Sequence, residues 1–376
     1  MEYHISDRMA PMQGSAIREI FKYAADPSVI SLAGGNPAPE LFPSEALAEI
    51  AGEVLRTQPV TALQYGITEG YAPLKEAVWE RLKRVEKIGA PDDALLIVSG
   101  GQQGIELMTK VLVNEGDVVL VEEPSFIGAT NAFRSYGAKL VGVPVENDGI
   151  DVAALEAAVK ANKNVRFLYT IPTFQNPMGV TMSVEKRKAV YELAKTYGFL
   201  ILEDNPYGDL TFDGTKLPTI KSMDTEGIVM YSGSFSKILA PGLRLGYLCA
   251  NQALVGKAVI AKQVSDVHTA MLPQLLAAEY LKRYDLDEAI VKMRANYAHK
   301  CATMLQAIED YFPADVTFTR PGGGLFIWCD LGHGLDTLAL SKKAIEQKVV
   351  YVPGNTFMTD MSKPCSALRL NYSTMS

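Results

Sequence analysis

Short runs of apolar residues alternate with longer amphipathic stretches between about Asp92 and Leu248. Each run has the length of a strand and is bounded by glycine, proline or charged residues. A repeated alternation of this kind predicts an α/β layer built on a parallel or mixed sheet. The predicted strands are "ALLIVSGG", "DVVLVEEP", "VRFLYTIP", "FLILEDNP", "GIVMYSGS" and "RLGYLCA".

Helical spacing appears between these runs and again towards the C-terminus. The stretches "QQGIELMTKVLV" and "VEKRKAVYELAKTYG" predict helices, and Gly198 stands where a C-cap glycine belongs. After about Val267 the pattern changes to long helices followed by "GGGLFIWCDL", which predicts a smaller α+β domain. We expect an N-terminal segment (1–45) that packs with the small domain, a large domain (46–266) and a small C-terminal domain (267–376).

Polar or conformationally special residues follow the predicted strands on their C-terminal side. Open α/β sheets bind ligands at that edge, so these residues are expected to line a site. They are Gly100-Gly101-Gln102, Glu123-Pro124-Ser125-Phe126, Gln175-Asn176-Pro177, Asp204-Asn205-Pro206-Tyr207 and the segment from Ser234 to Lys237.

Composition narrows the class of protein without identifying it. The 376 residues are 48% hydrophobic and 21% charged, and the net charge of −7 gives no general attraction to nucleic acid or anionic membranes. The first residues lack a secretory pattern, and no stretch approaches about 18 uninterrupted apolar residues, so a cytoplasmic protein is expected. The four cysteines are far apart and form no C-x-x-C pair, so neither a metal site nor disulfides are predicted.

Lys237, in "SGSFSK", is the first candidate for chemistry. A lysine desolvated at the end of a buried strand loses its proton, and the neutral amine attacks carbonyls to form a Schiff base. The alternative is a solvated surface lysine. Its neighbours Ser234, Ser236 and Arg244 favour a site, because hydroxyls and a guanidinium fork suit a phosphate dianion. "SGGQQGIEL" adds free N–H groups at a helix start, although alone it could be a plain tight turn.

Asp204 closes the run "FLILED", while its neighbour Glu203 should point to the opposite face of the sheet. A carboxylate beside a pyridine nitrogen keeps that nitrogen protonated, as pyridoxal phosphate (PLP) chemistry requires. Tyr207 and Asn176 would be donors to a ring oxygen, and Phe126 a flat face to stack on the ring. Each residue has a structural alternative as a loop acid, turn residue or core aromatic. Their placement at successive strand ends favours the site.

These motifs together identify a family. The chain resembles the fold-type I PLP-dependent aminotransferases of class I/II, most closely the branch of 2-aminoadipate and kynurenine aminotransferases. The resemblance implies a large domain with a mostly parallel central sheet flanked by helices, plus a smaller α+β domain. It runs over nearly the whole chain in "SLAGGNPAPELFP", "ALQYGITEGYAPLKEAV", "SGGQQGIEL", "EEPSFIGA", "PTFQNPMGV", "EDNPYGDL", "SGSFSKILAPGLRLGYL", "PGGGLFIW" and "LRLNYS".

The resemblance also implies roles for residues that hold the cofactor. Lys237 would bind PLP as an imine and, once released by substrate, carry the proton between Cα and the imine carbon. Asp204 would pair with the pyridinium nitrogen, Asn176 and Tyr207 would bond the phenolic oxygen, and Phe126 would stack where relatives often have tyrosine. The phosphate would be bound by Gly101, Gln102, Ser234, Ser236 and Arg244, with Tyr65 reaching it from the other subunit of a homodimer.

Four residues are implied in substrate binding. Arg369, in "LRLNYS", would take the α-carboxylate in a bidentate pair, although from the residues alone a structural arginine fits as well. Gly35 would let the backbone approach the substrate, with Asn176 beside it. Arg18, in "SAIREIFKYA", matches an N-terminal position that meets a side-chain carboxylate in acidic-substrate members. Relatives usually continue into a C-terminal helix beyond the segment "NYSTMS", so the resemblance implies that this helix is missing.

The sequence therefore predicts an aminotransferase that works by a ping-pong mechanism through pyridoxamine phosphate. Expected donors are L-amino acids with aromatic, 2-aminoadipate-like or glutamate-type side chains, and 2-oxoglutarate is the expected acceptor. One alternative is a β-lyase or decarboxylase on the same fold. Another is a ligand-sensing regulator, but such relatives carry a DNA-binding domain in front, and "SLAGG" begins at Ser31, which leaves too little room.

Overall fold

The computed structural model describes residues 3–10, 12 and 26–375. Within that part of the chain, one large sheet has the strand order β2-β9-β8-β7-β6-β3-β4-β5. All six strands predicted from apolar runs are present. The strands of this sheet are β2 (Asp93–Val98), β3 (Val118–Glu123), β4 (Lys139–Glu146), β5 (Gly149–Ile150), β6 (Val165–Thr170), β7 (Leu200–Asp204), β8 (Val229–Ser234) and β9 (Gly246–Asn251).

Most neighbouring strands of the large sheet run parallel. β8, β7, β6, β3 and β4 are parallel neighbours, whereas β9 is antiparallel to both β2 and β8, and β5 is antiparallel to β4. Parallel strands are buried on both faces, which explains why their sequences read as continuous apolar runs. The predicted α/β fold with a mostly parallel sheet is confirmed.

Consecutive residues of the central strands enter two different hydrophobic cores. On β7, Leu202 belongs to one core and Ile201 to the other. Because side chains alternate along a strand, Asp204 shares the face of Leu202, and Glu203 shares the face of Ile201. The prediction that these two carboxylates point to opposite faces is therefore confirmed.

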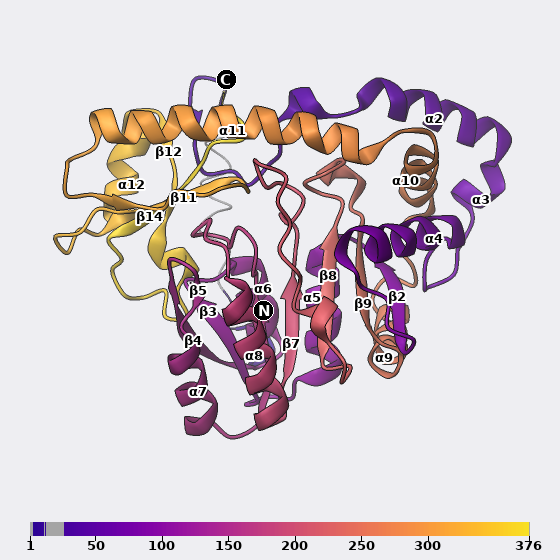
Figure 1. Cartoon of the computed structure of the whole chain (residues 1–376), viewed down its shortest axis with the longest axis horizontal. Helices are drawn as coiled ribbons and strands as arrows, with labels where there is room; N and C mark the ends of the chain where they lie inside the picture. Colours follow the sequence, from indigo (N-terminus) through magenta and orange to yellow (C-terminus); the bar gives the residue numbers. More distant parts are fainter. Residues whose placement is uncertain (1–2, 11, 13–25, 376) are drawn as a thin grey trace.

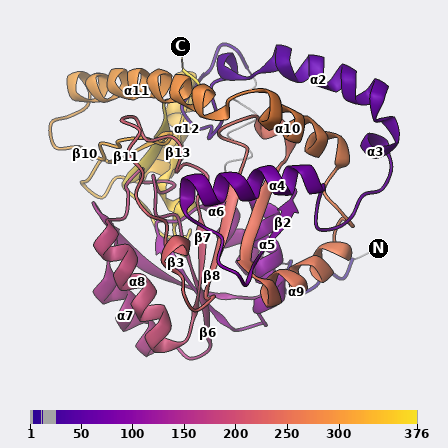
Figure 2. The ribbon, with the colours of Figure 1, turned by 45° about the vertical axis from the view of Figure 1, so that its right-hand side comes forward.

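Helices cover both faces of the large sheet (Figure 2). α7 and α8 lie side by side and contribute to the core on one face, while α5 packs against α6 and α9 on the other. The helix predicted at 184–198 is α8, and Gly198 ends it with a φ of 71°. These helices are α4 (Ala72–Arg81), α5 (Gly101–Leu112), α6 (Ile127–Ser135), α7 (Val152–Ala161), α8 (Val184–Tyr197) and α9 (Gln252–Gln263).

A second, antiparallel sheet has the order β10-β11-β14-β13 and lies beside the large one (Figure 1). The long helix α11 extends from above this sheet towards α2 and α10 (Figure 1). β1 (Ile30–Ser31) pairs with β12 (Val349–Val350).

The division of the chain into three parts at residues 45 and 266 stays a prediction. The remaining elements are α2 (Ser44–Thr57), α3 (Pro59–Leu63), α10 (Met271–Arg283), α11 (Leu286–Tyr311), α12 (Thr337–Glu346), β10 (Thr317–Phe318), β11 (Phe326–Asp330), β13 (Val352–Pro353) and β14 (Ala367–Asn371).

Candidate active site

Lys237 follows β8 and points its amine at the segment that carries Gly35. Its Nζ donates a hydrogen bond of 2.6 Å to the Gly35 carbonyl oxygen. Desolvation lowers the pKa of Lys237 to about 8, and the positive charges of Arg369 and Arg244 act in the same direction. A lysine with this pKa is partly neutral near pH 7 to 8, so its amine is available as a nucleophile.

Asp204 ends β7 with only 5% of its surface exposed. Its Oδ2 accepts a hydrogen bond of 2.8 Å from the hydroxyl of Tyr169, on the neighbouring strand β6. Burial raises the pKa of Asp204 to about 6, against the opposing effect of the Tyr169 hydrogen bond. A cationic ring nitrogen beside this carboxylate would offset the cost of its burial.

Asn176, Tyr207 and Arg369 form a chain of contacts between the two sheets. Asn176 Nδ2 lies 3.5 Å from the Tyr207 hydroxyl, and Asn176 Oδ1 accepts a bond of 2.8 Å from Arg369 Nη1. Arg369 Nη2 donates to the Ala33 carbonyl oxygen at 2.7 Å. The structure therefore brings residues from β14, from the loop after β6 and from the segment after β7 to one place.

The guanidinium of Arg369 is buried between two phenyl rings. Its Cζ lies 4.1 Å from the ring centre of Phe326 and 5.0 Å from that of Phe357. Burial lowers its pKa to about 10, so it stays charged at neutral pH. Among the described residues, none accepts a hydrogen bond from its Nε. A buried cation with an unsatisfied donor is suited to a carboxylate ligand.

A group of donors suited to an anion lies next to Asp204. The helix α5 begins at Gly101, and a Cβ added to Gly100 would lie 2.5 Å from Arg244 Nη2. A Cβ added to Gly101 would lie 3.9 Å from both Asp204 Oδ1 and Ser234 Cβ. The Ser234 hydroxyl accepts a bond of 3.1 Å from the Ser236 backbone N–H. The glycines thus leave room between a helix N-terminus, a guanidinium and two serines.

Phe126 immediately precedes α6, close to the side chain of Gln102. Gln102 Nε2 donates to the Gly128 carbonyl oxygen at 2.8 Å. A Cβ added to Gly128 would collide with both the Phe126 ring and Gln102 Oε1. The ring and the amide therefore share one small space, which only a glycine at residue 128 leaves open.

One predicted site residue among those described, Tyr65, is not part of this cluster. Tyr65 is 81% exposed, and its ring meets that of His268 edge to face at 5.8 Å between ring centres. Arg18 lies outside the described residues. Of the others, Gly35 contacts Lys237, Asn176 joins Tyr207 to Arg369, and Gly101 lies close to Asp204 and Ser234.

Sequence reasoning missed three neighbours of the site. Tyr169 holds Asp204, while Phe326 and Phe357 enclose Arg369. Tyr169 precedes a strand end in "VRFLYTIP", and Phe326 lies within the motif "PGGGLFIW", so both stood within recognised stretches. No comparable signal distinguishes Phe357 in the sequence.

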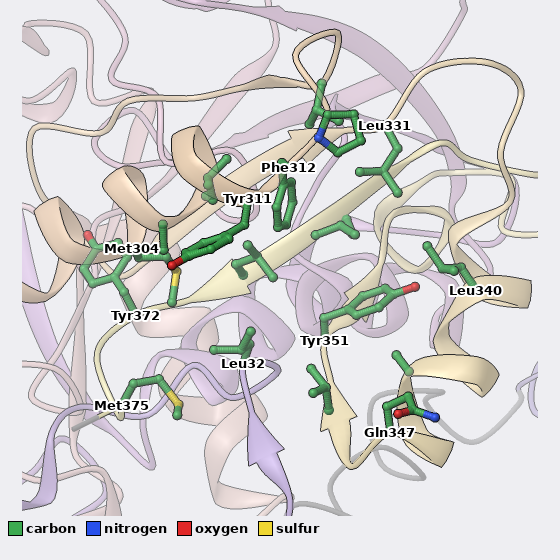
Figure 3. A pocket seen from close by; sticks show the side chains of 18 of the residues that line it. Leu32, Met304, Tyr311, Phe312, Leu331, Leu340, Gln347, Tyr351, Tyr372 and Met375 are labelled. Atoms are coloured by element: carbon green, nitrogen blue, oxygen red, sulfur yellow. The ribbon is translucent and has the colours of Figure 1, made fainter.

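A large cavity lies apart from this cluster. It has a volume of about 1000 Å³ and is lined mostly by apolar side chains of α11, α12, the small sheet and the segments beside them. Met304 and Tyr311 come from α11, and Tyr351 stands between β12 and β13 (Figure 3). Neither Lys237 nor Asp204 lines it. The candidate chemistry is therefore separate from this cavity.

The cluster fits PLP in its donor set. Lys237 offers an amine to the aldehyde, Asp204 a carboxylate to the ring nitrogen, and the start of α5 with Arg244 an anion site for the phosphate. The unsatisfied Nε of Arg369 leaves a place for the carboxylate of an amino acid. Fold and site together define a PLP-dependent enzyme.

Comparison with known proteins agrees with this class. Residues 27–376 match the family model described as aminotransferase class I and II. The aromatic-amino-acid aminotransferase 1 of Thermococcus litoralis is 41% identical over 375 residues, covering 99% of this chain and 90% of that protein. The 2-aminoadipate transaminase of Thermus thermophilus is 41% identical over 367 residues, which cover 97% of this chain and 90% of that protein.

A solved structure is similar over almost the whole chain. It is the kynurenine aminotransferase of Pyrococcus horikoshii in complex with PMP, with a TM-score of 0.94, 38% identity and coverage of 99% of this chain and 93% of that chain. The chain belongs to the class I and II aminotransferases. It is a PLP-dependent enzyme that transfers amino groups.

Proposed function

We propose that the enzyme moves an amino group between an L-amino acid and a 2-oxo acid such as 2-oxoglutarate, in two half-reactions of a ping-pong cycle. The expected donors have aromatic, 2-aminoadipate-like or glutamate-type side chains, as the names of the relatives suggest. The observation that carries the proposal is the buried Arg369, which reaches Asn176 with one nitrogen and keeps its Nε unsatisfied.

The residues divide into those that hold the ring and those that hold the phosphate. We assign Asp204 to the pyridine nitrogen, Asn176 and Tyr207 to the ring oxygen, and Phe126 to the ring face. When bound, PLP supplies an electron sink for the negative charge left at the substrate Cα. The proposed phosphate ligands are Gly101, Gln102, Ser234, Ser236 and Arg244.

Lys237 is assigned two tasks in turn. Its amine first holds the aldehyde, which requires the neutral form that desolvation favours. Once released by substrate, the same amine would be placed to take the proton from the substrate Cα and to return it to the imine carbon of the cofactor. Because the amine starts 2.6 Å from the Gly35 carbonyl oxygen, it lies close to the segment where the substrate would enter.

Arg369 is assigned to the substrate α-carboxylate, and Gly35 to the close approach of the backbone. A Cβ added to Gly35 would lie 3.2 Å from the Phe326 ring, so a larger residue would crowd the ring that packs on Arg369. Arg18 stays a prediction for the side-chain carboxylate of acidic donors.

A panel of amino donors with 2-oxoglutarate tests the substrate proposal. We expect kcat/KM for phenylalanine, kynurenine and 2-aminoadipate to exceed that for alanine and serine by about tenfold or more, since each methylene buried in an apolar pocket contributes about 0.8 kcal/mol. Glutamate is tested with an aromatic 2-oxo acid as acceptor, because with 2-oxoglutarate its products would be identical to its reactants. Coupled assays of 2-oxo acid formation give the values. Turnover of small neutral donors alone would contradict the preference. A keto product that accumulates from a β-substituted donor without any acceptor would instead identify the lyase alternative.

We also propose that the enzyme is a homodimer whose sites are completed by Tyr65 of the partner. Exposed apolar side chains lie near Tyr65 and its contact His268 in the sequence: Leu63 is 71% exposed, and Val264, shortly before His268, is 74% exposed. Val60 and Ile67 extend this group at 75% and 61% exposure. Exposed apolar residues gathered in this way mark interfaces between proteins.

Sedimentation velocity tests the dimer. Replacing Leu63 and Val264 with aspartate should convert dimers to monomers and weaken PLP binding about tenfold, since a hydrogen bond to the phosphate is worth about 1.5 kcal/mol. Val291→Asp is the matched control, because Val291 is an equally apolar side chain, 57% exposed, on another helix, α11. A double variant that stays dimeric would exclude this surface as the interface.

Location and partners complete the proposal. Across the described residues, none of the helices is both long and apolar enough to span a bilayer. A cytoplasmic location stays a prediction, as does the absence of a nucleic-acid partner. Small-molecule amino acids and 2-oxo acids are the proposed partners.

A further inference from the structure

We infer that Gln175, held by the buried carboxylate of Glu122, is a positioning residue that sets the places of Asn176 and Phe126 relative to each other. The inference rests on the proposed roles of those two residues towards the ring. Phe126 and Asn176 come from different loops, after β3 and after β6, and must meet opposite parts of one ring. Some contact between the loops has to fix their spacing.

The side chain of Gln175 makes that contact. Its Nε2 donates to the Pro124 carbonyl oxygen at 2.7 Å, in the loop that leads to Phe126. Its Oε1 accepts a bond of 2.9 Å from the backbone N–H of Met178, within the loop that carries Asn176. The side chain is only 1% exposed, so water does not compete for these bonds. One amide therefore joins the two loops.

Glu122 fixes the orientation of that amide. Its Oε2 accepts a bond of 3.2 Å from Gln175 Nε2 and one of 3.1 Å from the Ile171 backbone N–H, while its Oε1 accepts from Thr170 Oγ1 at 2.5 Å. Because the Pro124 carbonyl oxygen can only accept and the Met178 backbone N–H can only donate, the amide must turn its N–H groups towards Pro124 and Glu122. The oxygen of the amide is then left for Met178.

The surroundings of Glu122 show why three donors are needed. The residue is 1% exposed, and burial raises its pKa to about 7, assisted by the negative charge of Asp204 and opposed by the hydrogen bonds of Thr170, Ile171 and Gln175. A buried carboxylate without such partners would be strongly unfavourable. Among the described residues, Glu122 accepts hydrogen bonds from Thr170, Ile171 and Gln175 and from none of the residues assigned to cofactor or substrate, so we assign its effect to Gln175.

The pH titration of the visible absorption of the bound cofactor tests the inference. The group that titrates is the imine nitrogen that joins Lys237 to the cofactor. A hydrogen-bond donor to the ring oxygen stabilises the negative charge of that oxygen most when the imine nitrogen carries no proton. Displacement of Asn176 should therefore raise the pH at the titration midpoint. We expect Gln175→Leu to raise it by about half a unit or more and to increase the PLP dissociation constant about 3- to 10-fold. Glu122→Gln should raise the titration midpoint and the PLP dissociation constant by smaller amounts than Gln175→Leu, because the new amide can still present one oxygen to Gln175.

Glu203→Gln is the matched control. Glu203 lies on β7, is equally buried, also has a pKa raised to about 7 by burial, and accepts backbone hydrogen bonds from Ile220 and Lys221 away from the site. This variant should lower thermal stability and leave the titration midpoint at its wild-type value. If Glu203→Gln shifted the titration midpoint as much as Gln175→Leu, the shift would be a result of general destabilisation, and the inference would be wrong.

Asn176→Ala separates failure of the inference from failure of the site assignment. If Asn176→Ala raises the midpoint while folded Gln175→Leu titrates and binds PLP like the wild type, Gln175 does not position the loop and the inference is wrong. If Asn176→Ala also leaves the midpoint unchanged, the assignment of Asn176 to the ring oxygen is wrong. Circular dichroism and thermal melting of each holoenzyme establish that the variants are folded.

Discussion

Replacement of Lys237 by alanine should lower kcat by about four orders of magnitude or more, since the amine is assigned both the covalent attachment and the proton transfer. Lys237→Arg should be as inactive, because arginine keeps the charge but supplies no neutral amine. Both variants should still bind PLP through the phosphate and ring contacts. Single-turnover mixing with an amino donor, followed by absorption, measures the loss directly.

Borohydride reduction gives an independent test of the attachment. In the wild type, reduction should fix the cofactor to the peptide that contains Lys237, and neither variant should yield a labelled peptide. Label on another lysine, or an active Lys237→Arg variant, would contradict the assignment. The pKa of about 8 adds a pH dependence: recombination of the cofactor-free enzyme with PLP should accelerate as the pH rises towards 8 and level off above it, as the amine loses its proton.

Asp204→Asn should lower kcat/KM by about 10- to 1000-fold. A neighbouring opposite charge changes a pKa by about 1 to 3 units, and each unit is a tenfold change in the fraction of protonated ring nitrogen. The amide keeps the size of the side chain and removes the charge, so the variant tests electrostatics and not packing. Steady-state kinetics at several pH values give the size of the loss.

Tyr169→Phe and Asp204→Glu calibrate that result. Tyr169→Phe removes only the hydrogen bond of 2.8 Å to Asp204 and should cost about tenfold. Asp204→Glu keeps a charge in a displaced position and should retain more activity than Asp204→Asn. Equal activity of Asp204→Asn and the wild type would mean that this carboxylate does not hold the ring nitrogen.

The sequence predicted the parts of the site that depend on where strands end. Lys237, Asp204 and Asn176 each follow an apolar run, and the edge of a parallel sheet collects such residues whatever the details of packing. The predicted fold was confirmed for the same reason, since long buried strands leave a clear pattern. The eight-residue strand β4 was not predicted, because most of its side chains are only partly buried or exposed and it forms no continuous apolar run. The two-residue strands β1, β5, β10, β12 and β13 leave little pattern and were not predicted individually.

Contacts that depend on register could not be predicted. Tyr169 reaches Asp204 only because β6 and β7 pair with Tyr169 opposite Leu202, and no local signal fixes that alignment. Arg369 looks like an ordinary strand residue until β11 brings Phe326 beside it. Its role came from resemblance, and the structure adds the buried environment. The proposed role of Tyr65 cannot be seen in a single chain, because it depends on a second subunit.

The anchoring of Arg369 has a consequence for selectivity. Its guanidinium is already confined by Asn176, by the Ala33 carbonyl and by the flanking rings, so the rotamer entropy of about 2 kcal/mol that a free arginine would surrender on capturing a ligand has been lost during folding. A guanidinium held in this way cannot change its rotamer to bind a ligand whose polar group lies in a different place. Esters and amides of the same amino acids should therefore be rejected much more strongly than their similar shapes suggest.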